Sequence, residues 1–153
     1  MTEIEKKRQE VFLNAIFQNT KTALQSIADI LPKVKNKELE EELKVQYEKY
    51  DEIANKCRQY AEKYQLNMKD NNFFEKAKLW TSIKLTTLTD NSTRHLAEML
   101  LFGTNMGIIT CYKDRYDHLG ASEELDILAQ QLENIEIGNF DNLKPFLNKD
   151  QKR

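Results

Sequence analysis

The chain has 153 residues, of which 40% are apolar and 31% charged, with only four Gly and two Pro. All-β and α/β proteins need more turn residues and more β-branched runs, so this composition favours an all-α protein. The net charge is -2 with both signs interleaved, which leaves no basic surface for nucleic acid or for an anionic membrane.

A chain of this length can bury a sizeable core without disulfides or metals. We expect one helical-bundle domain over residues 1–148 and a loose polar tail over 149–153. The amino terminus MTEIEKKRQE lacks the apolar segment of a secretory signal. The longest uncharged run, Met99 to Tyr112, is shorter than the roughly 20 residues of a membrane span. These features predict a cytoplasmic protein, with Cys57 and Cys111 as buried thiols.

Apolar residues at helical spacing predict a first helix over 2–31, which Pro32 ends. The linker that follows is short, so a second helix over 37–66 must turn back antiparallel to the first. Its inward positions are predicted at steps of three or four residues, namely Leu39, Leu43, Tyr47, Tyr50, Ala54, Cys57, Ala61 and Tyr64. We expect the tyrosines to fill core volume, and a ligand pocket is the alternative.

The helical pattern breaks over residues 67–72 and resumes as a short crossover helix over about 73–88. Such a crossover carries the chain back along the bundle, so the third long helix should start near the same end as the second. Three large apolar residues on this segment, Phe73, Phe74 and Trp80, are candidates for an exposed association surface.

Two more long helices are predicted over 90–118 and 122–144. The third should turn Met99, Gly103 and Met106 inward. The glycine pair Gly103 and Gly107 predicts close packing against the first or the fourth long helix, or room for a bulky aromatic such as Trp80. Gly120 is placed to adopt a left-handed backbone after the third helix, and Ser122 to cap the fourth. We expect a neutral, hydrogen-bonded His95 and a surface or capping role for His118.

The layout of four long helices with one crossover between the second and third resembles the ferritin-like superfamily. The strings FLNAIFQNTKTALQSI, NSTRHLAEMLLFGTNMGIIT and ENIEIGNFDNLKPFL are similar to a poorly characterised group of bacterial ferritin-like proteins of unknown function. The resemblance implies a ferritin-like four-helix bundle of bacterial origin over nearly the whole chain.

Active ferritin-like proteins hold two irons with a carboxylate from each of two helices and a Glu-x-x-His pair from each of the others. No Glu in this chain is followed by His three positions later. The corresponding core candidates are Asn19, Tyr47, Tyr50, Glu136 and Asn139. Amides and phenols are poor ligands for ferrous iron, so we expect no catalytic residue, no metal ligand and no cofactor.

Two hypotheses follow for the function. The first is a non-enzymatic ferritin-like bundle that acts as a structural or protein-interaction module, as a homodimer or with an unknown protein partner. The alternative is a metal-binding or redox protein that holds iron or manganese at an unusual site in the bundle core. The content of the space among the core candidates bears on both, because a space filled by side chains leaves no room for a small molecule.

Overall fold

The computed structural model describes residues 1–69 and 90–151, and this part of the chain is all-helical, without strands. The long helices are α1 (Glu3–Ile30), α2 (Lys37–Tyr64), α4 (Thr93–Asp117) and α5 (Glu123–Leu143). Two 3-10 helices follow α1 and α5, namely η1 (Leu31–Lys33) and η2 (Lys144–Gln151). The predicted all-α bundle is confirmed. None of the helices in the described ranges has the length and apolarity needed to cross a membrane.

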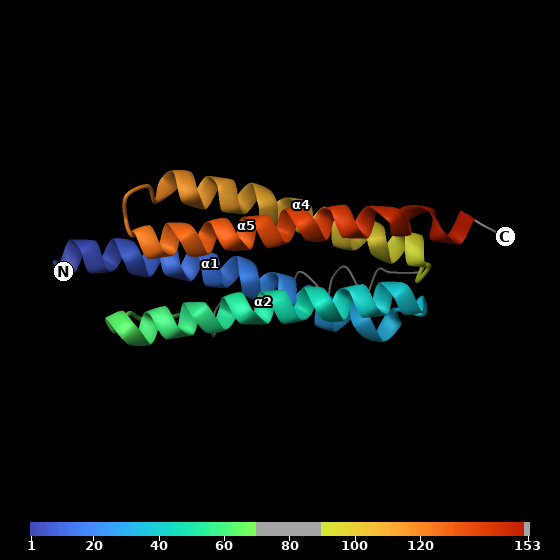
Figure 1. Cartoon of the computed structure of the whole chain (residues 1–153), viewed down its shortest axis with the longest axis horizontal. Helices are drawn as coiled ribbons and strands as arrows, with labels where there is room; N and C mark the ends of the chain where they lie inside the picture. The colour runs from blue at the N-terminus through green and yellow to red at the C-terminus, as the bar shows by residue number, and fades with distance from the viewer. Residues whose placement is uncertain (70–89, 152–153) are drawn as a thin grey trace.

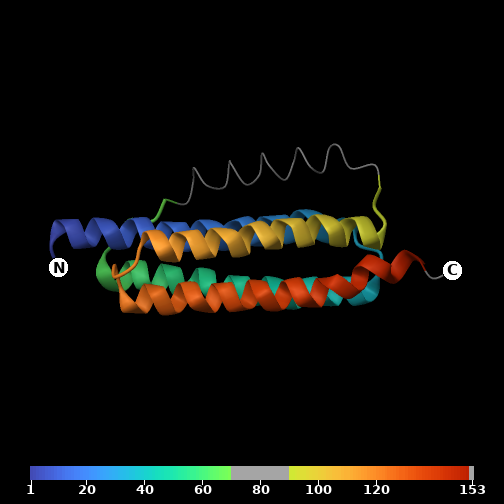
Figure 2. The same ribbon diagram turned by 90° about the horizontal axis from the view of Figure 1, so that it is seen from above.

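The four long helices lie alongside one another in an elongated bundle (Figure 1). Helix α1 packs against α2 and α4, and α5 packs against the same two helices. Figure 2 shows α1 with α4 in one layer and α2 with α5 in the other. Helices α2 and α4 start at the same end of the bundle and run in the same direction, as the predicted crossover requires.

The predicted crossover helix over 73–88, with Phe73, Phe74 and Trp80, lies outside the described residues. The chain that leaves α2 is bound to α1. The backbone N–H of Asn67 donates to Glu10 Oε2 at 2.6 Å, and that of Lys69 donates to Asn14 Oδ1 at 2.7 Å. The side chain of Asn14 donates in return to the carbonyl oxygen of Asn67 at 2.9 Å.

Short polar side chains fix the helix starts. Ser122 accepts a hydrogen bond from the Leu125 backbone N–H and caps α5, as predicted, and Ser92 caps α4 in the same way. The predicted left-handed backbone of Gly120 is present, with φ of 79°. Helix α2 ends at Tyr64, and the next residue, Gln65, is also left-handed, with φ of 55°. The sequence did not lead us to expect this conformation at a glutamine.

The inward face of α2 differs from the prediction at Tyr47, which is 39% exposed. The neighbouring Gln46 is 2% exposed and faces the core instead. Adjacent residues of a helix point about 100° apart, and at this turn of α2 Gln46 occupies the inward position in place of Tyr47. The buried positions of α2 run Leu39, Leu43, Gln46, Tyr50, Ile53, Ala54, Cys57, Tyr60 and Ala61.

The inward face of α4 was also predicted wrongly at Met106, which is 49% exposed. The buried residues of α4 are Leu96, Ala97, Leu100, Leu101 and Cys111. This helix is uncharged over Met99 to Tyr112, so its polarity pattern does not indicate which face turns inward. Both cysteines are buried free thiols, as expected.

The carboxyl end of the chain is more regular than predicted. Helix α5 ends at Leu143, and η2 continues to Gln151, so residues 149–151 of the predicted loose tail have helical backbone. Leu143 and Phe146 are buried and attach this end to the core.

Candidate functional site

A cavity of about 470 Å³ opens between α1 and α4. Most of its lining comes from these two helices, and Gln46 and Tyr50 of α2 and Glu136 of α5 form its floor. Figure 2 shows α2 and α5 in the layer beneath α1 and α4. The walls are largely apolar and include Ala23, Ile27, Ile30, Met99, Leu100, Phe102 and Met106. The described side chains therefore do not fill the space among the core candidates.

The floor of the cavity consists of three polar side chains that are almost completely buried. Gln46 and Tyr50 of α2 are each 2% exposed, and Glu136 of α5 is 1% exposed. All three reach the cavity because they occupy inward positions of their helices, where an apolar residue would otherwise extend the core. Gln46 is held by its own helix, since its Nε2 donates to Glu42 Oε2 at 2.8 Å.

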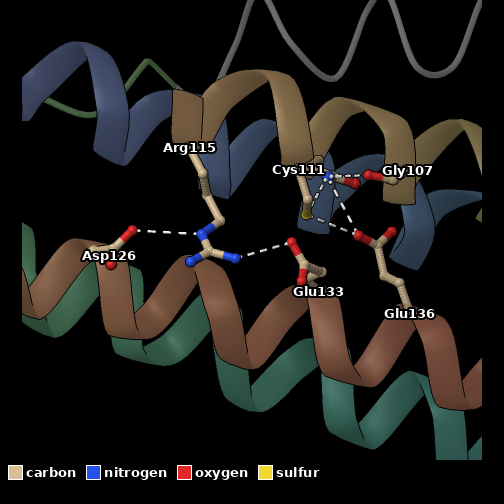
Figure 3. A network of polar contacts seen from close by, with 7 residues as sticks. Gly107, Cys111, Arg115, Asp126, Glu133 and Glu136 are labelled. Atoms are coloured by element: carbon tan, nitrogen blue, oxygen red, sulfur yellow. Dashed lines mark hydrogen bonds and ion pairs between the residues drawn. The ribbon is translucent and has the colours of Figure 1, made fainter. Parts of the chain in front are cut away.

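Glu136 is the centre of a small network that joins α1, α4 and α5 (Figure 3). Its Oε1 accepts from Cys111 Sγ at 3.1 Å and from Asn19 Nδ2 at 3.4 Å. Asn19 Nδ2 also donates to the carbonyl oxygen of Gly107 at 3.0 Å. The hydrogen bonds that described residues donate to this carboxyl group thus all end on Oε1.

Burial controls the protonation of this network. Burial raises the pKa of Glu136 to about 8, the hydrogen bonds from Cys111 and Asn19 act in the opposite sense, and nearby Glu133 adds to the rise. Burial also raises the pKa of the Cys111 thiol far above its usual range, with a further rise from Glu136. At neutral pH Glu136 is therefore mainly a neutral acid and Cys111 a thiol, which is a poor nucleophile.

Gly107 makes room for the buried carboxyl group. A Cβ atom at this position would lie 2.0 Å from Glu136 Oε2 and 3.1 Å from Asn19 Oδ1. The close approach predicted from the glycine pair is therefore present at Gly107, with side chains of α5 and α1 rather than with a helix backbone. Any larger residue here would displace Glu136.

A second polar group lies beside this network and has a structural role. Arg115 of α4 donates to Glu133 Oε1 at 3.1 Å and to Asp126 Oδ1 at 3.4 Å, both on α5 (Figure 3). Glu133 is 7% exposed, so this pairing offsets the cost of burying its charge.

The structure brings three of the five core candidates together at the cavity, namely Asn19, Tyr50 and Glu136. Asn139 is completely buried but does not line the cavity, and neither of its amide atoms has a hydrogen-bond partner among the described residues. Tyr47 lies on the outer side of α2. The sequence analysis did not identify Gln46 as an inward residue of α2. It lies three residues after Leu43 and four before Tyr50, which matches the helical repeat.

Neither histidine of the chain lines the cavity. His95 Nδ1 lies 3.5 Å from Glu98 Oε2 at the start of α4, and His118 caps the end of α4 and stacks on Phe12 with ring centroids 5.1 Å apart. Within residues 1–69 and 90–151, no three His, Cys, Asp or Glu side chains are grouped so that they could hold a metal ion. The cavity offers a place to bind a molecule and, in its described lining, no activated nucleophile.

Comparisons with known proteins do not assign the chain to a family. No protein-family model matches it, and no curated protein and no solved structure is significantly similar to it. The function is therefore inferred from the geometry of the cavity and from the chemistry of the residues that line it.

Proposed function

We propose that this chain is a non-enzymatic binding protein that holds a small, largely apolar molecule in the cavity between α1 and α4. The observation that carries the proposal is the cavity itself, with about 470 Å³ of space, apolar walls and a floor of three buried polar side chains. Small-molecule sites commonly combine apolar walls with a few fixed polar groups that orient the ligand.

We propose further that the bundle is ferritin-like, bacterial and cytoplasmic, and that it works without a resident di-iron centre. The order of the helices, the parallel course of α2 and α4, and the three quoted strings support the ferritin-like relationship. Asn19, Tyr50 and Asn139 stand where the resemblance implies metal ligands, and neutral side chains there favour a bound molecule over iron.

A metal-binding or redox role with iron or manganese is the alternative. It would have to be built on Glu136 and Asp114, the carboxyl groups in the described lining of the cavity, and on Cys111, which contacts Glu136 and whose thiol keeps its proton at neutral pH. Hard divalent metals prefer several oxygen or imidazole ligands, so this set supports a metal site less well than it supports a small molecule.

Titration with phenylbutanol, a neutral probe with an apolar body, tests the proposal. We expect saturable binding at one site, with amide chemical-shift changes concentrated in the facing parts of α1 and α4. Ala23→Phe fills the cavity and should weaken binding at least about tenfold. Ala28→Phe places the same side chain on the exposed side of α1, outside the cavity, and should leave the affinity unchanged.

Absence of saturable binding, or equal losses in the two Phe variants, would disprove the proposal. Ser26→Phe is a second cavity-filling variant in case Ala23→Phe does not fold. Elemental analysis of protein purified without chelator tests the alternative separately, since stoichiometric iron or manganese would support a metal-binding protein.

A further inference from the structure

The described lining of the cavity contains carboxyl groups and no basic side chain. Among its described lining residues, Glu136 and Asp114 are acidic, and none is Lys, Arg or His. Arg115 follows Asp114 in α4, but its side chain is bound to Glu133 and Asp126 of α5 and does not line the cavity. A negatively charged ligand would therefore find no basic partner in this lining, whereas a positive one would find two acids.

Two side-chain oxygens beside the cavity also accept no hydrogen bond from a described residue. Glu136 Oε2 accepts none of the hydrogen bonds that reach this carboxyl group, and Asn19 Oδ1 is likewise left open while its Nδ2 donates to Gly107. Both oxygens lie next to Gly107, at 2.0 Å and 3.1 Å from the point that a Cβ atom would occupy.

From this charge pattern and these open acceptors, and resting on the binding function proposed above, we propose that the ligand of the cavity is an organic cation. The molecule would be an amine with an apolar body, whose ammonium group donates hydrogen bonds to Glu136 and Asn19. Its body would lie along Ile27, Leu100 and the other apolar walls.

Charge-assisted hydrogen bonds between an ammonium group and a carboxylate are about twice as strong as neutral ones. Burial strengthens them further, because the dielectric constant inside a protein is lower than in water. An amide oxygen beside the carboxylate can accept a second ammonium proton. The same site disfavours a carboxylate or phosphate, because placing a second negative charge in the cavity without a cation is costly. The cavity should therefore discriminate by charge among molecules of equal shape.

Binding of a cation should change the protonation of Glu136. Because the pKa of Glu136 is about 8 in the free protein, the acid is mostly protonated at pH 6.5, and an ammonium group beside it favours the ionised form. Close to one proton should therefore leave the protein per amine bound. The titratable groups around it are Cys111 and Asp114 of α4, Glu133 of α5 and Tyr50 of α2, while α1 presents the neutral amide of Asn19.

The test compares three probes of one shape, namely phenylbutylamine, phenylbutanol and phenylbutyrate, by calorimetry at pH 6.5 in two buffers of different ionisation enthalpy. We expect the amine to bind at least about tenfold more tightly than the alcohol, with about one proton released, and the acid to show no saturable binding. The affinity for the amine should rise about tenfold from pH 6 to pH 7.

Glu136→Gln should bring the ratio of amine to alcohol affinity to about one and abolish the proton release. Glu133→Gln is the matched control, because it changes a buried carboxylate one turn earlier on α5 that does not line the cavity, and it should keep the preference. A preference that survives in Glu136→Gln and disappears in Asp114→Asn would overturn the assignment of the ammonium group to Glu136.

The outcomes separate this inference from the function on which it rests. Equal binding of amine and alcohol would overturn the organic cation and leave a binding cavity. Tighter binding of the acid would overturn it in the same way. Failure of all three probes to bind saturably, for example because another part of the chain fills the space, would overturn both proposals.

Discussion

Gly107 and Gly138 both lie inside long helices, but their surroundings differ. At Gly107 an added Cβ atom would meet the Glu136 carboxyl group at 2.0 Å, whereas at Gly138 it would have no neighbour within 4 Å. A glycine inside a helix costs roughly 0.5–1 kcal/mol relative to alanine unless the space is needed. Gly107 is thus required by packing. Gly138 is not, and it destabilises the helix because a glycine loses more conformational entropy on folding than an alanine would.

Gly138→Ala should raise the free energy of unfolding by roughly 0.5–1 kcal/mol, and Gly107→Ala should lower it by about 1–3 kcal/mol because Glu136 must move. Urea denaturation at one pH measures both variants against the natural chain. A stabilised Gly107→Ala variant would contradict the packing described around the carboxyl group.

The buried acid makes stability depend on pH. Folding raises the pKa of Glu136 from 4.5 to about 8, chiefly through burial, so the folded state retains a proton that the unfolded chain loses. The stability that this proton provides is fully present below pH 4.5 and is lost as the pH rises through 8. Burial raises the pKa of Asp114 as well, and that group acts in the same sense.

We therefore expect the free energy of unfolding to fall between pH 5 and pH 8, by up to about 1.4 kcal/mol per pH unit from Glu136 alone. Glu136→Gln should flatten most of this slope, because the amide does not titrate. Asp114→Asn should remove a smaller part of it. Urea titrations at four pH values give the slopes, and an unchanged slope in Glu136→Gln would contradict the burial of an ionisable acid at this position.

At the scale of the elements, the end of α2 contains a strained residue. Gln65 has φ of 55°, which is a left-handed conformation. In this conformation the Cβ atom crowds the backbone, so glycine is the residue most often found in it at a helix end. Its side chain is exposed and contributes no described core contact. This left-handed residue turns the chain toward α1, where the hydrogen bonds of Asn67 to Glu10 and Asn14 offset the strain.

Gln65→Gly should raise the free energy of unfolding by up to about 1 kcal/mol by removing this strain. The matched control is Gln59→Gly, an exposed glutamine inside the same helix, which should lower it by about 0.7–1 kcal/mol. Opposite signs for the two changes, measured by urea denaturation, would verify the left-handed end, and equal losses would contradict it.

At the scale of the whole molecule, α4 has a row of exposed apolar residues at helical spacing, which begins at the cavity-lining Met106. The row consists of Met106, Ile109, Tyr112 and Tyr116, which are 45–76% exposed. Rows of this kind often mark contact surfaces in soluble proteins. It offers the predicted homodimer a place to form.

If the homodimer forms through this row, sedimentation equilibrium should give a mass of twice 18.0 kDa, and Tyr112→Glu should reduce it to 18.0 kDa. Tyr47→Glu, an equal change at an exposed tyrosine of α2, should keep the dimer. A mass of 18.0 kDa for the natural chain over the whole concentration range would disprove the homodimer.

The sequence by itself determined the number, order and approximate ends of the four described helices. Helix ends are encoded locally by residues such as Pro32, Gly120 and Ser122, and the helical repeat of apolar residues is strong in α1, α2 and α5. The direction of α4 also followed, because the length of the predicted crossover required the chain to return along the bundle.

The tertiary structure alone decided which faces meet and where space remains. In α4 the run from Met99 to Tyr112 is uncharged all round, so burial of Cys111 rather than Met106 depends on packing against α1 and α5. The contact of Asn19, Gly107 and Glu136 joins residues far apart in the chain, and no local pattern specifies it. A cavity likewise arises where facing side chains fail to fill the space between two helices, which is a property of the assembled bundle and not of either helix.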